Sequence, residues 1–285
     1  MKTQGGSLTG DKKLTKPTVS IFIALLALAL CLCLVMALAP TGVMADEVSD
    51  DCGDNLVWSL DSEGTLTIEP KPSTTGGSMY DYEEIQLVGV AVPWEQYSDD
   101  IVKVVVKEGV TSIGNYAFIY CSNITTLDFS DCTTLESIGG NAFSRCSNIT
   151  TLDLSDCTKL ESIGDNAFYY CEKLATVDLS GCTSLKSIGT EAFNTCRTLT
   201  AVNFSGCTKL ESIGLGAFRQ CYALTAADLS GCSSLKSIGN YAFYYCGKLT
   251  AVDFSGCSSL NTIGNDAFAQ CSALATVDLS GCSSL

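Results

Sequence analysis

The sequence predicts an α/β solenoid in which each coil contains one short strand and one short helix. The main observation is a 25-residue unit that recurs six times in direct succession, from Ser122 to Cys271. A shorter relative of this unit ends at Cys121, and a truncated copy closes the sequence at Leu285. Fixed periods of about 20 to 50 residues indicate repeat architectures, in which each unit buries its apolar side against its neighbours.

The strand and the helix follow from the residue pattern within one unit. In the unit Ser122–Cys146, polar and apolar side chains alternate from Thr126 to Ser130, which predicts a short strand with one buried face. Further on, Ala142, Phe143 and Cys146 have helical spacing, so we expect one or two helical turns there. Gly139 precedes this predicted helix in a position where every unit has glycine, and we expect a backbone conformation that other residues avoid.

Residues 46–100 do not repeat, and we expect them to form a small β-rich cap. Asn55–Leu60 and Thr65–Glu69 have the pattern of two strands, and Asp61-Ser62-Glu63-Gly64 between them predicts a hairpin. The first coil needs its apolar face covered, which is the expected role of the cap. The predicted solenoid covers residues 101–285 and ends in the middle of a repeat. An uncapped end indicates either a truncated chain or a docking edge, and truncation is the favoured interpretation.

Residues 1–45 have the pattern of a secretory signal peptide. Four lysines precede the 19 apolar residues Ile21–Ala39, and Val43-Met44-Ala45 is a small-residue cleavage site. The apolar run is also long enough to cross a bilayer, so an uncleaved anchor is the alternative. Both interpretations place the repeats outside the cell, because basic flanks stay cytoplasmic. The expected location is therefore extracellular or at the cell surface, with membrane contact only through this segment.

The charge balance and the absence of histidine limit the possible functions. The chain has 16 basic and 31 acidic residues, and removal of residues 1–45 leaves 12 and 30, a net charge of 12 − 30 = −18. Such a surface repels phosphate backbones, so no nucleic-acid partner is expected. With no histidine in the sequence, Ser-His-Asp and Cys-His catalysis are excluded. We expect a protein that is not an enzyme.

Fourteen of the 17 cysteines form two columns, each with a period of 25 residues. One column runs from Cys121 to Cys271 and the other from Cys132 to Cys282, with seven members each. Because seven is an odd number, the cysteines of one column cannot all form disulfides with each other. The favoured interpretation is buried thiols that act as small apolar side chains with weak S–H donors. Disulfides between the columns are the alternative.

The repeat resembles the leucine-rich repeat, whose signature is L-x-x-L-x-L-x-x-N/C-x-L. Its second half, S-I-G-x-x-A-F-x-x-C, is similar to the BspA-type subfamily of bacterial and protist surface proteins. The resemblance covers Ile101–Leu285, although the subfamily's shorter unit is kept only at Val105–Gly114. It implies an exported adhesin or interaction protein without catalysis in the repeats.

A column of acidic residues on the predicted strands is the first candidate site. In a leucine-rich coil this position points to the concave, solvent-exposed side. Six of its seven positions are aspartate: Asp128, Asp153, Asp178, Asp228, Asp253 and Asp278. One interpretation is a calcium-binding or ligand-binding face, because carboxylate oxygens suit hard cations. The favoured alternative is a duplicated position whose side chains are solvated or bond nearby backbone and serine groups. Apart from calcium, no cofactor is expected.

The second candidate is a set of tyrosines at variable positions after the repeat phenylalanine. Tyr169, Tyr170, Tyr244 and Tyr245 are amphipathic side chains suited to contacts with protein or sugar, although they would equally suit packing over the short helices. The sequence thus predicts a binding scaffold for a protein or glycan ligand, engaged in adhesion or protein interaction through the concave strand face. The alternative is a structural module that self-associates through its acidic column with calcium or through its open carboxyl edge.

Overall fold

The computed structural model describes residues 48–85 and 89–285. The predicted signal or anchor segment, residues 1–45, lies outside the described residues. Ala45–Leu285 forms one compact unit. Among the described residues, no helix has the length and apolar character needed to span a membrane.

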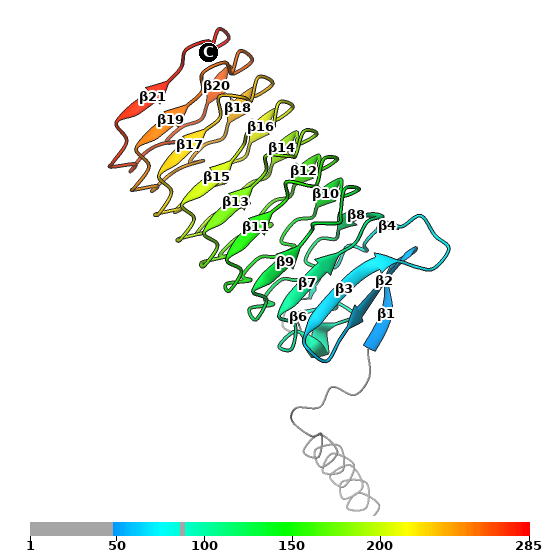
Figure 1. Cartoon of the computed structure of the whole chain (residues 1–285). Coiled ribbons are helices and arrows are strands. Elements are labelled where there is room, and N and C mark those ends of the chain that lie inside the picture. The colour runs from blue at the N-terminus through cyan, green and yellow to red at the C-terminus, as the bar shows by residue number, and fades with distance from the viewer. Residues whose placement is uncertain (1–47, 86–88) are drawn as a thin grey trace, which may run out of the picture. The chain divides into compact units, whose positions relative to one another are not determined.

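The repeats form a stack of coils in which two ladders of short parallel strands run along the chain (Figure 1). One strand of each coil joins the first ladder, in register with residues 25 positions away, as Thr151 is with Thr176. Its members are β9 (Thr126–Asp128), β11 (Thr151–Asp153), β13 (Thr176–Asp178), β15 (Ala201–Asn203), β17 (Ala226–Asp228), β19 (Ala251–Asp253) and β21 (Thr276–Asp278). The predicted solenoid and its first strand are confirmed.

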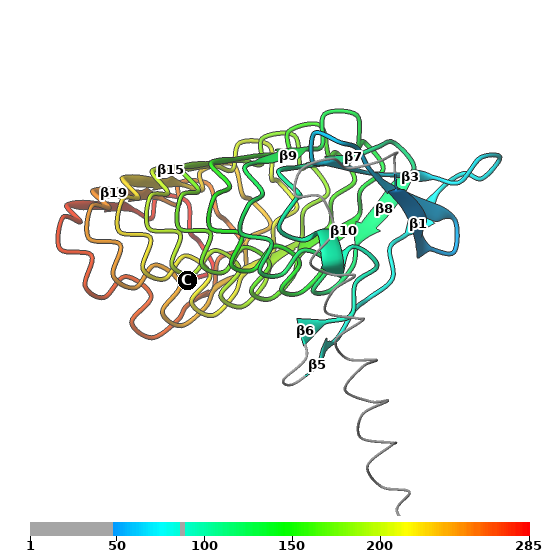
Figure 2. The same cartoon turned by 90° about the horizontal axis from the view of Figure 1, so that it is seen from below.

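The second ladder lies on another side of the coils and consists of two-residue strands apart from the four-residue β8 (Figure 2). It begins with β4 (Gly77–Ser78) and β8 (Val110–Ile113) and continues through the Ser-Ile pair of each repeat. These strands are β10 (Ser137–Ile138), β12 (Ser162–Ile163), β14 (Ser187–Ile188), β16 (Ser212–Ile213), β18 (Ser237–Ile238) and β20 (Thr262–Ile263). The isoleucine of each pair from β10 to β18 is buried in the core, and Ile263 of β20 is partly exposed.

The amino-terminal strands continue the first ladder. Strands β1 (Val48–Gly53), β2 (Leu56–Leu60) and β3 (Thr65–Pro70) are antiparallel, and β2 and β3 form the predicted hairpin. β3 then pairs in parallel with β7 (Lys103–Val106), which pairs with β9. Two further strands, β5 (Glu84–Ile85) and β6 (Gly89–Val90), form a separate antiparallel pair. Because β3 shares its backbone hydrogen bonds with β7, these strands cover the start of the coil stack as one continuous sheet.

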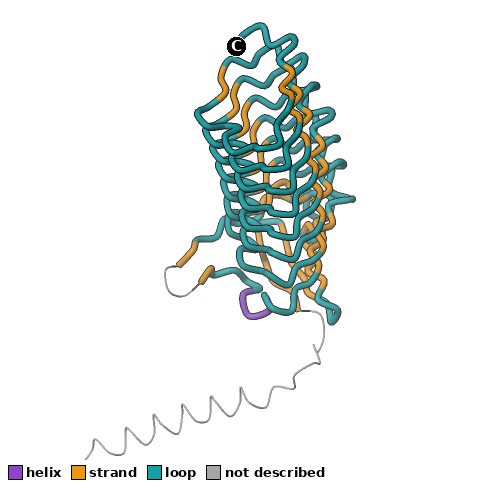
Figure 3. Tube along the Cα trace, turned by 90° about the vertical axis from the view of Figure 1, so that its left-hand side faces the viewer, coloured by secondary structure: helices purple, strands orange, loops and turns teal. Residues whose placement is uncertain are grey.

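The short helix predicted in each coil is wrong. The one helical element among the described residues is η1 (Glu95–Tyr97), near the start of the stack (Figure 3). In the segment after Gly139, alternate N–H groups donate to the next coil: Asn141 to Asp165 O, Phe143 to Ala167 O and Arg145 to Tyr169 O. Asn141 and Arg145 also have positive φ, 55° and 64°. An α-helix needs right-handed residues throughout and N–H groups that bond within the segment, so this segment forms two consecutive turns instead.

The glycine that precedes these turns is required by close approach between coils. At Gly164 a Cβ atom would lie 2.7 Å from the carbonyl carbon of Gly139 in the preceding coil. Its φ is not in the left-handed region, because the positive-φ glycines of the structure lie elsewhere. Our expectation of an unusual backbone conformation at this position was therefore wrong. The repeated glycine allows neighbouring backbones to stack.

A column of stacked phenylalanine rings runs through the core behind these turns. Consecutive rings from Phe118 to Phe268 are 5.1–5.3 Å apart and within 12° of parallel. At the amino-terminal end Trp94 stacks on Phe118 at 5.0 Å, and its indole N–H donates to the carbonyl of Ala117. The column therefore begins on a buried tryptophan, which closes the apolar end of the first coil.

The cysteines of both columns have buried thiols that donate hydrogen bonds to the preceding coil. Cys171 Sγ donates to the carbonyl of Phe143 at 3.3 Å, and Cys182 Sγ donates to the carbonyl of Leu154 at the same distance. All fifteen cysteines among the described residues are free thiols, and fourteen of them are buried. Burial raises the pKa of the Cys157 and Cys207 thiols to about 12. The interpretation as small apolar side chains with weak S–H donors is confirmed.

The burial of these thiols predicts their reactivity. The thiolate is the reactive form, so thiols of raised pKa without solvent access should resist iodoacetamide at pH 8. In the Ala45–Leu285 unit we expect no labelling of Cys171 or Cys182 under native conditions and complete labelling in guanidinium, measured by mass spectrometry of peptides. Cys282, which is only partly buried, is the internal control and should react first. Rapid native labelling of Cys171 would contradict the packing described.

Candidate binding faces

The acidic column lies on the outer side of the first ladder, where the sequence placed it. In each strand from β9 to β19 the middle residue is buried and the residues on either side point outward, as in Thr151-Leu152-Asp153. In the last strand, β21, all three residues are exposed. We call the outward side chains of β9, β11, β13, β15, β17, β19 and β21 the strand face. It presents a column of threonine and alanine beside a column of aspartate and one asparagine.

Each aspartate of the strand face accepts a hydrogen bond from its own strand end. The Asp153 carboxylate accepts the N–H of Ser155 at 3.0 Å, and Asp178 accepts the N–H of Ser180 at 2.9 Å. The same bond forms at Asp128, Asn203, Asp228, Asp253 and Asp278. Short polar side chains often satisfy the backbone in this way. The bonds support the interpretation of these residues as local caps that end the strand.

Calcium binding at the acidic column has no support from the geometry. Within residues 48–85 and 89–285, no group of three or more acidic or cysteine side chains is placed so that it could hold a metal ion. The aspartates are one coil apart and each is held towards its own serine. A metal needs several oxygen ligands converging on one point, and a straight column does not provide this arrangement.

The strand face is interrupted between β9 and β11. β9 belongs to the sheet that starts at β1, whereas β11 begins a separate six-stranded sheet. Phe129, which follows β9, takes the place of a leucine in the next two coils and packs edge-on against Phe143 at 6.5 Å. A cavity of about 210 Å³ lies at the interruption, lined by Leu127, Asp128, Phe129, Ser130, Asp153 and Asp156. We call this cavity the slot.

A shallow groove continues along the strand face from the slot. It has a volume of about 450 Å³ and crosses β11, β13 and β15. Its lining residues are Thr151, Leu152, Asp153, Thr176, Val177, Asp178, Ala201 and Asn203. The slot and the groove together form a polar, acidic surface several coils long.

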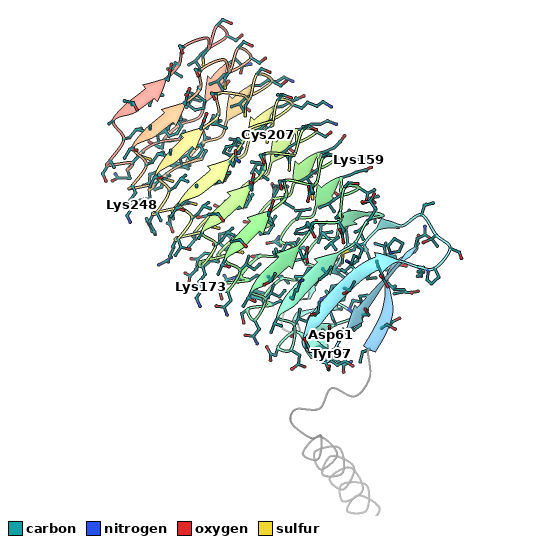
Figure 4. All side chains as sticks on the ribbon, in the orientation of Figure 1. Asp61, Tyr97, Lys159, Lys173, Cys207 and Lys248 are labelled. Atoms are coloured by element: carbon teal, nitrogen blue, oxygen red, sulfur yellow. The ribbon has the colours of Figure 1, made fainter. Side chains whose placement is uncertain are left out.

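The cations near the strand face lie mainly at its borders. Figure 4 shows Lys173 and Lys248 projecting from the loops that lead into β13 and β19, and Lys159 from the loop after β11. The exception is Lys103, whose Nζ lies 2.9 Å from the Asp128 carboxylate at the slot. Among the described residues, Asp153 and Asp178 of the groove form no ion pair, so their charge is left to solvent or to a partner.

The predicted tyrosines lie on a different side of the coil from the aspartates. Tyr169 and Tyr170 follow the buried Phe168 in the consecutive turns, and Tyr244 and Tyr245 are their equivalents three coils later. Each pair is in ring contact, with centroids 4.5 Å apart. We call the outward side chains of residues 115–121 and the six equivalent segments the turn face. The two sets of predicted residues therefore do not form one site.

Sequence reasoning missed the arginines that accompany these tyrosines. Each of the three arginines of the chain lies over a tyrosine ring. Arg145 lies between Tyr120 and Tyr170, Arg219 over Tyr244, and Arg197 over Tyr222. The signal was present in the sequence, because Arg145 is one repeat away from both Tyr120 and Tyr170.

The family follows from the repeat. The model of the family described as "BspA type Leucine rich repeat region" matches six copies of the repeat. They lie within residues 96–225 and 186–284, about two thirds of the chain. The chain belongs to the BspA-type leucine-rich repeat family. Membership in this family suggests a protein-interaction scaffold, since its repeats present side chains on a regular framework. No curated protein matches the chain.

Several solved structures of bacterial leucine-rich repeat proteins match the chain at low sequence identity. A protein from Eubacterium ventriosum is 19% identical, covers 83% of this chain and 86% of its own, and has a TM-score of 0.34. The T. pallidum leucine-rich repeat protein is 20% identical, with 79% and 91% covered and a TM-score of 0.37. A leucine-rich cell surface protein from Faecalibacterium prausnitzii is 18% identical, with 83% and 96% covered and a TM-score of 0.23.

The ion pair at the slot predicts a pH dependence. Lys103, and then the Ser130 hydroxyl, lower the pKa of Asp128 to about 2. An unfolded aspartate has a pKa of about 3.9, so the carboxylate stabilises the fold above that pH. This stabilisation is lost as the pH falls from about 4 to about 2. The carboxylate is 31% exposed, so its contribution should stay below about 1 kcal/mol.

We therefore expect Asp128→Asn to lower the free energy of unfolding at pH 7 and to have no effect at pH 2, measured by denaturant titration. Asp228→Asn is the control: Asp228 accepts the same backbone N–H bond, and the described residues give it neither an ion pair nor the serine hydroxyl bond of Asp128. Equal losses for both variants at pH 7 would contradict a role for Lys103.

Proposed function

We propose that the chain is an exported, non-enzymatic scaffold of the cell surface that binds a protein partner through the strand face. The observation that carries the proposal is the acidic groove and slot on β9, β11, β13 and β15, with volumes of about 450 and 210 Å³. The basic segment before the apolar run in residues 1–45 supports export, and the cell-surface description of the Faecalibacterium prausnitzii protein is consistent with it.

The strand face suits an extended basic segment of a protein. Carboxylates of Asp153, Asp156 and Asp178 line the groove and slot. Acidic and basic surfaces attract each other and guide association, and matching charge across an interface sets its specificity. The groove is rigid at β13 and β15, because each of these strands is paired with a strand of the coil on either side. Little conformational entropy is therefore lost there when a partner binds.

The absence of histidine and the matching environments of Asp153 and Asp178 argue against catalysis in the groove. Acid–base catalysis by paired carboxylates needs two groups with different pKa values. Along the strand face each aspartate instead repeats the same bond to its own serine. Binding is the function that such a repeated surface supports best.

A displayed random-peptide library tests the proposal directly. The Ala45–Leu285 unit is the bait, and the variant Thr176→Arg with Asp178→Lys, which blocks the groove and reverses its charge, is used for counter-selection. We expect peptides rich in lysine and arginine that bind the parent about tenfold or more tightly than the variant, an effect of about 1.4 kcal/mol. Their affinity should fall as salt is raised.

A turn-face variant, Tyr244→Ala with Tyr245→Ala, is the matched control and should bind the selected peptides as the parent does. Enrichment of no peptide that distinguishes parent from groove variant would overturn the proposal. So would selection of acidic or uncharged peptides only.

A further inference from the structure

The turn face differs in composition from the rest of the molecule. Its seven segments, residues 115–121 and their equivalents, contain seven of the eleven tyrosines and two of the three arginines of the chain, but no lysine. Their charge is two arginines against Asp165, Glu191 and Asp266, 2 − 3 = −1, in a chain of net charge −15. Tyrosine and arginine are enriched in binding surfaces, and lysine is depleted there. The turn face is therefore a nearly neutral aromatic strip on an acidic protein.

Arginine stacking holds these tyrosines in place. The Arg145 guanidinium lies 5.6 Å from the ring centre of Tyr120 and 5.2 Å from that of Tyr170. Arg219 lies 5.6 Å from the ring centre of Tyr244. Planar guanidinium groups over aromatic rings form favourable cation–π contacts. Each such contact restricts both side chains before any ligand arrives, which reduces the entropy lost on binding.

Arg145, Tyr120 and Tyr170 form one aromatic cluster. A second cluster lies on the sixth segment of the turn face. Tyr241, Tyr244 and Tyr245 meet edge to face, with Tyr244 at 5.4 Å from Tyr241 and 4.5 Å from Tyr245. Tyr241 and Tyr245 are still 38% and 41% exposed. Large exposed aromatic side chains that are grouped in this way mark binding sites more often than scattered ones do. The rings are ordered by their neighbours and remain open to a ligand.

The two clusters are aligned along the stack. Tyr170 and Tyr245 occupy the same position of the repeat, three coils apart, which corresponds to about 14 Å at the usual spacing of parallel strands. Amide and hydroxyl side chains, among them Asn141, Asn166 and Gln220, occupy other turn positions along the same strip. A long, narrow strip with aromatic clusters and hydrogen-bonding groups matches an extended polymer better than a broad protein surface, which buries about 800 Å² on each partner.

We propose that the turn face binds a neutral glycan chain that lies along the coil stack. The apolar C–H faces of sugar rings would pack on the tyrosine rings, while sugar hydroxyls bond the arginine, asparagine and glutamine side chains. Tyrosine suits this role because it has an apolar body and a polar tip. An anionic glycan is disfavoured, because the acidic protein repels it. The proposal concerns a different face from the strand face and does not depend on the function proposed there.

Native gel electrophoresis in the presence of polysaccharide tests this inference. The Ala45–Leu285 unit is run through gels that contain soluble β-glucan, xylan or galactomannan, with polygalacturonate as the anionic comparison. We expect retardation by at least one neutral polysaccharide. Tyr244→Ala with Tyr245→Ala, and separately Tyr169→Ala with Tyr170→Ala, should each weaken this binding about tenfold, as expected for loss of aromatic anchor residues.

Two controls separate this face from general effects. Tyr80→Ala removes a tyrosine of similar exposure, 43%, from outside the turn face and should leave retardation unchanged. The groove variant Thr176→Arg with Asp178→Lys should also bind polysaccharide normally, and thermal unfolding checks that each tyrosine variant folds. No retardation in any neutral gel would overturn the proposal, as would retardation unaffected by both double tyrosine variants or strongest in polygalacturonate.

Discussion

Every coil of this protein depends on the coils on either side of it, and the stacked phenylalanine column shows this dependence most clearly. Each internal ring is covered on both faces by the equivalent ring of a neighbouring coil, and Trp94 covers the first. Hydrogen bonds between coils are also formed by the cysteine thiols, by the backbone N–H groups of the turns and by both strand ladders. A single 25-residue unit has no core of its own, so stability arises from the interfaces between units.

This constraint explains why binding surfaces can vary along a regular framework. The buried positions repeat almost without change, because each must fit its own equivalent one coil away. The outward positions have no such partner requirement, and there the repeats differ: tyrosine pairs at two coils, arginine at others, and serine or asparagine elsewhere. Variation at outward positions is what a binding scaffold needs, and it allows chemically different faces on one molecule.

The sequence predicted the features that depend on the repeat period. It did not predict the local structure where hydrogen-bond partners determine the backbone conformation. The 25-residue period predicted the solenoid, and the alternation around Leu127 predicted the first strand. The spacing of Ala142, Phe143 and Cys146 suits a helix equally well, but the N–H groups beside them bond the next coil, which the spacing alone does not reveal. Likewise, the aspartate column was correctly placed on the strand face, whereas its bonds to Ser155 and Ser180, and the stacking of Arg145 on two tyrosines, required coordinates.

The most direct test of this account compares Phe168→Ala with Phe268→Ala by denaturant unfolding of the Ala45–Leu285 unit. Phe168 is fully buried between the stacked rings of Phe143 and Phe193. Phe268 is partly exposed, stacks on Phe243 and contacts Phe254 edge-on. Loss of a buried phenylalanine costs about 3–5 kcal/mol, so we expect that loss for Phe168→Ala and a clearly smaller one for Phe268→Ala. A loss for Phe168→Ala below about 1 kcal/mol, the range of surface substitutions, would contradict the claim that stacking between coils holds the fold.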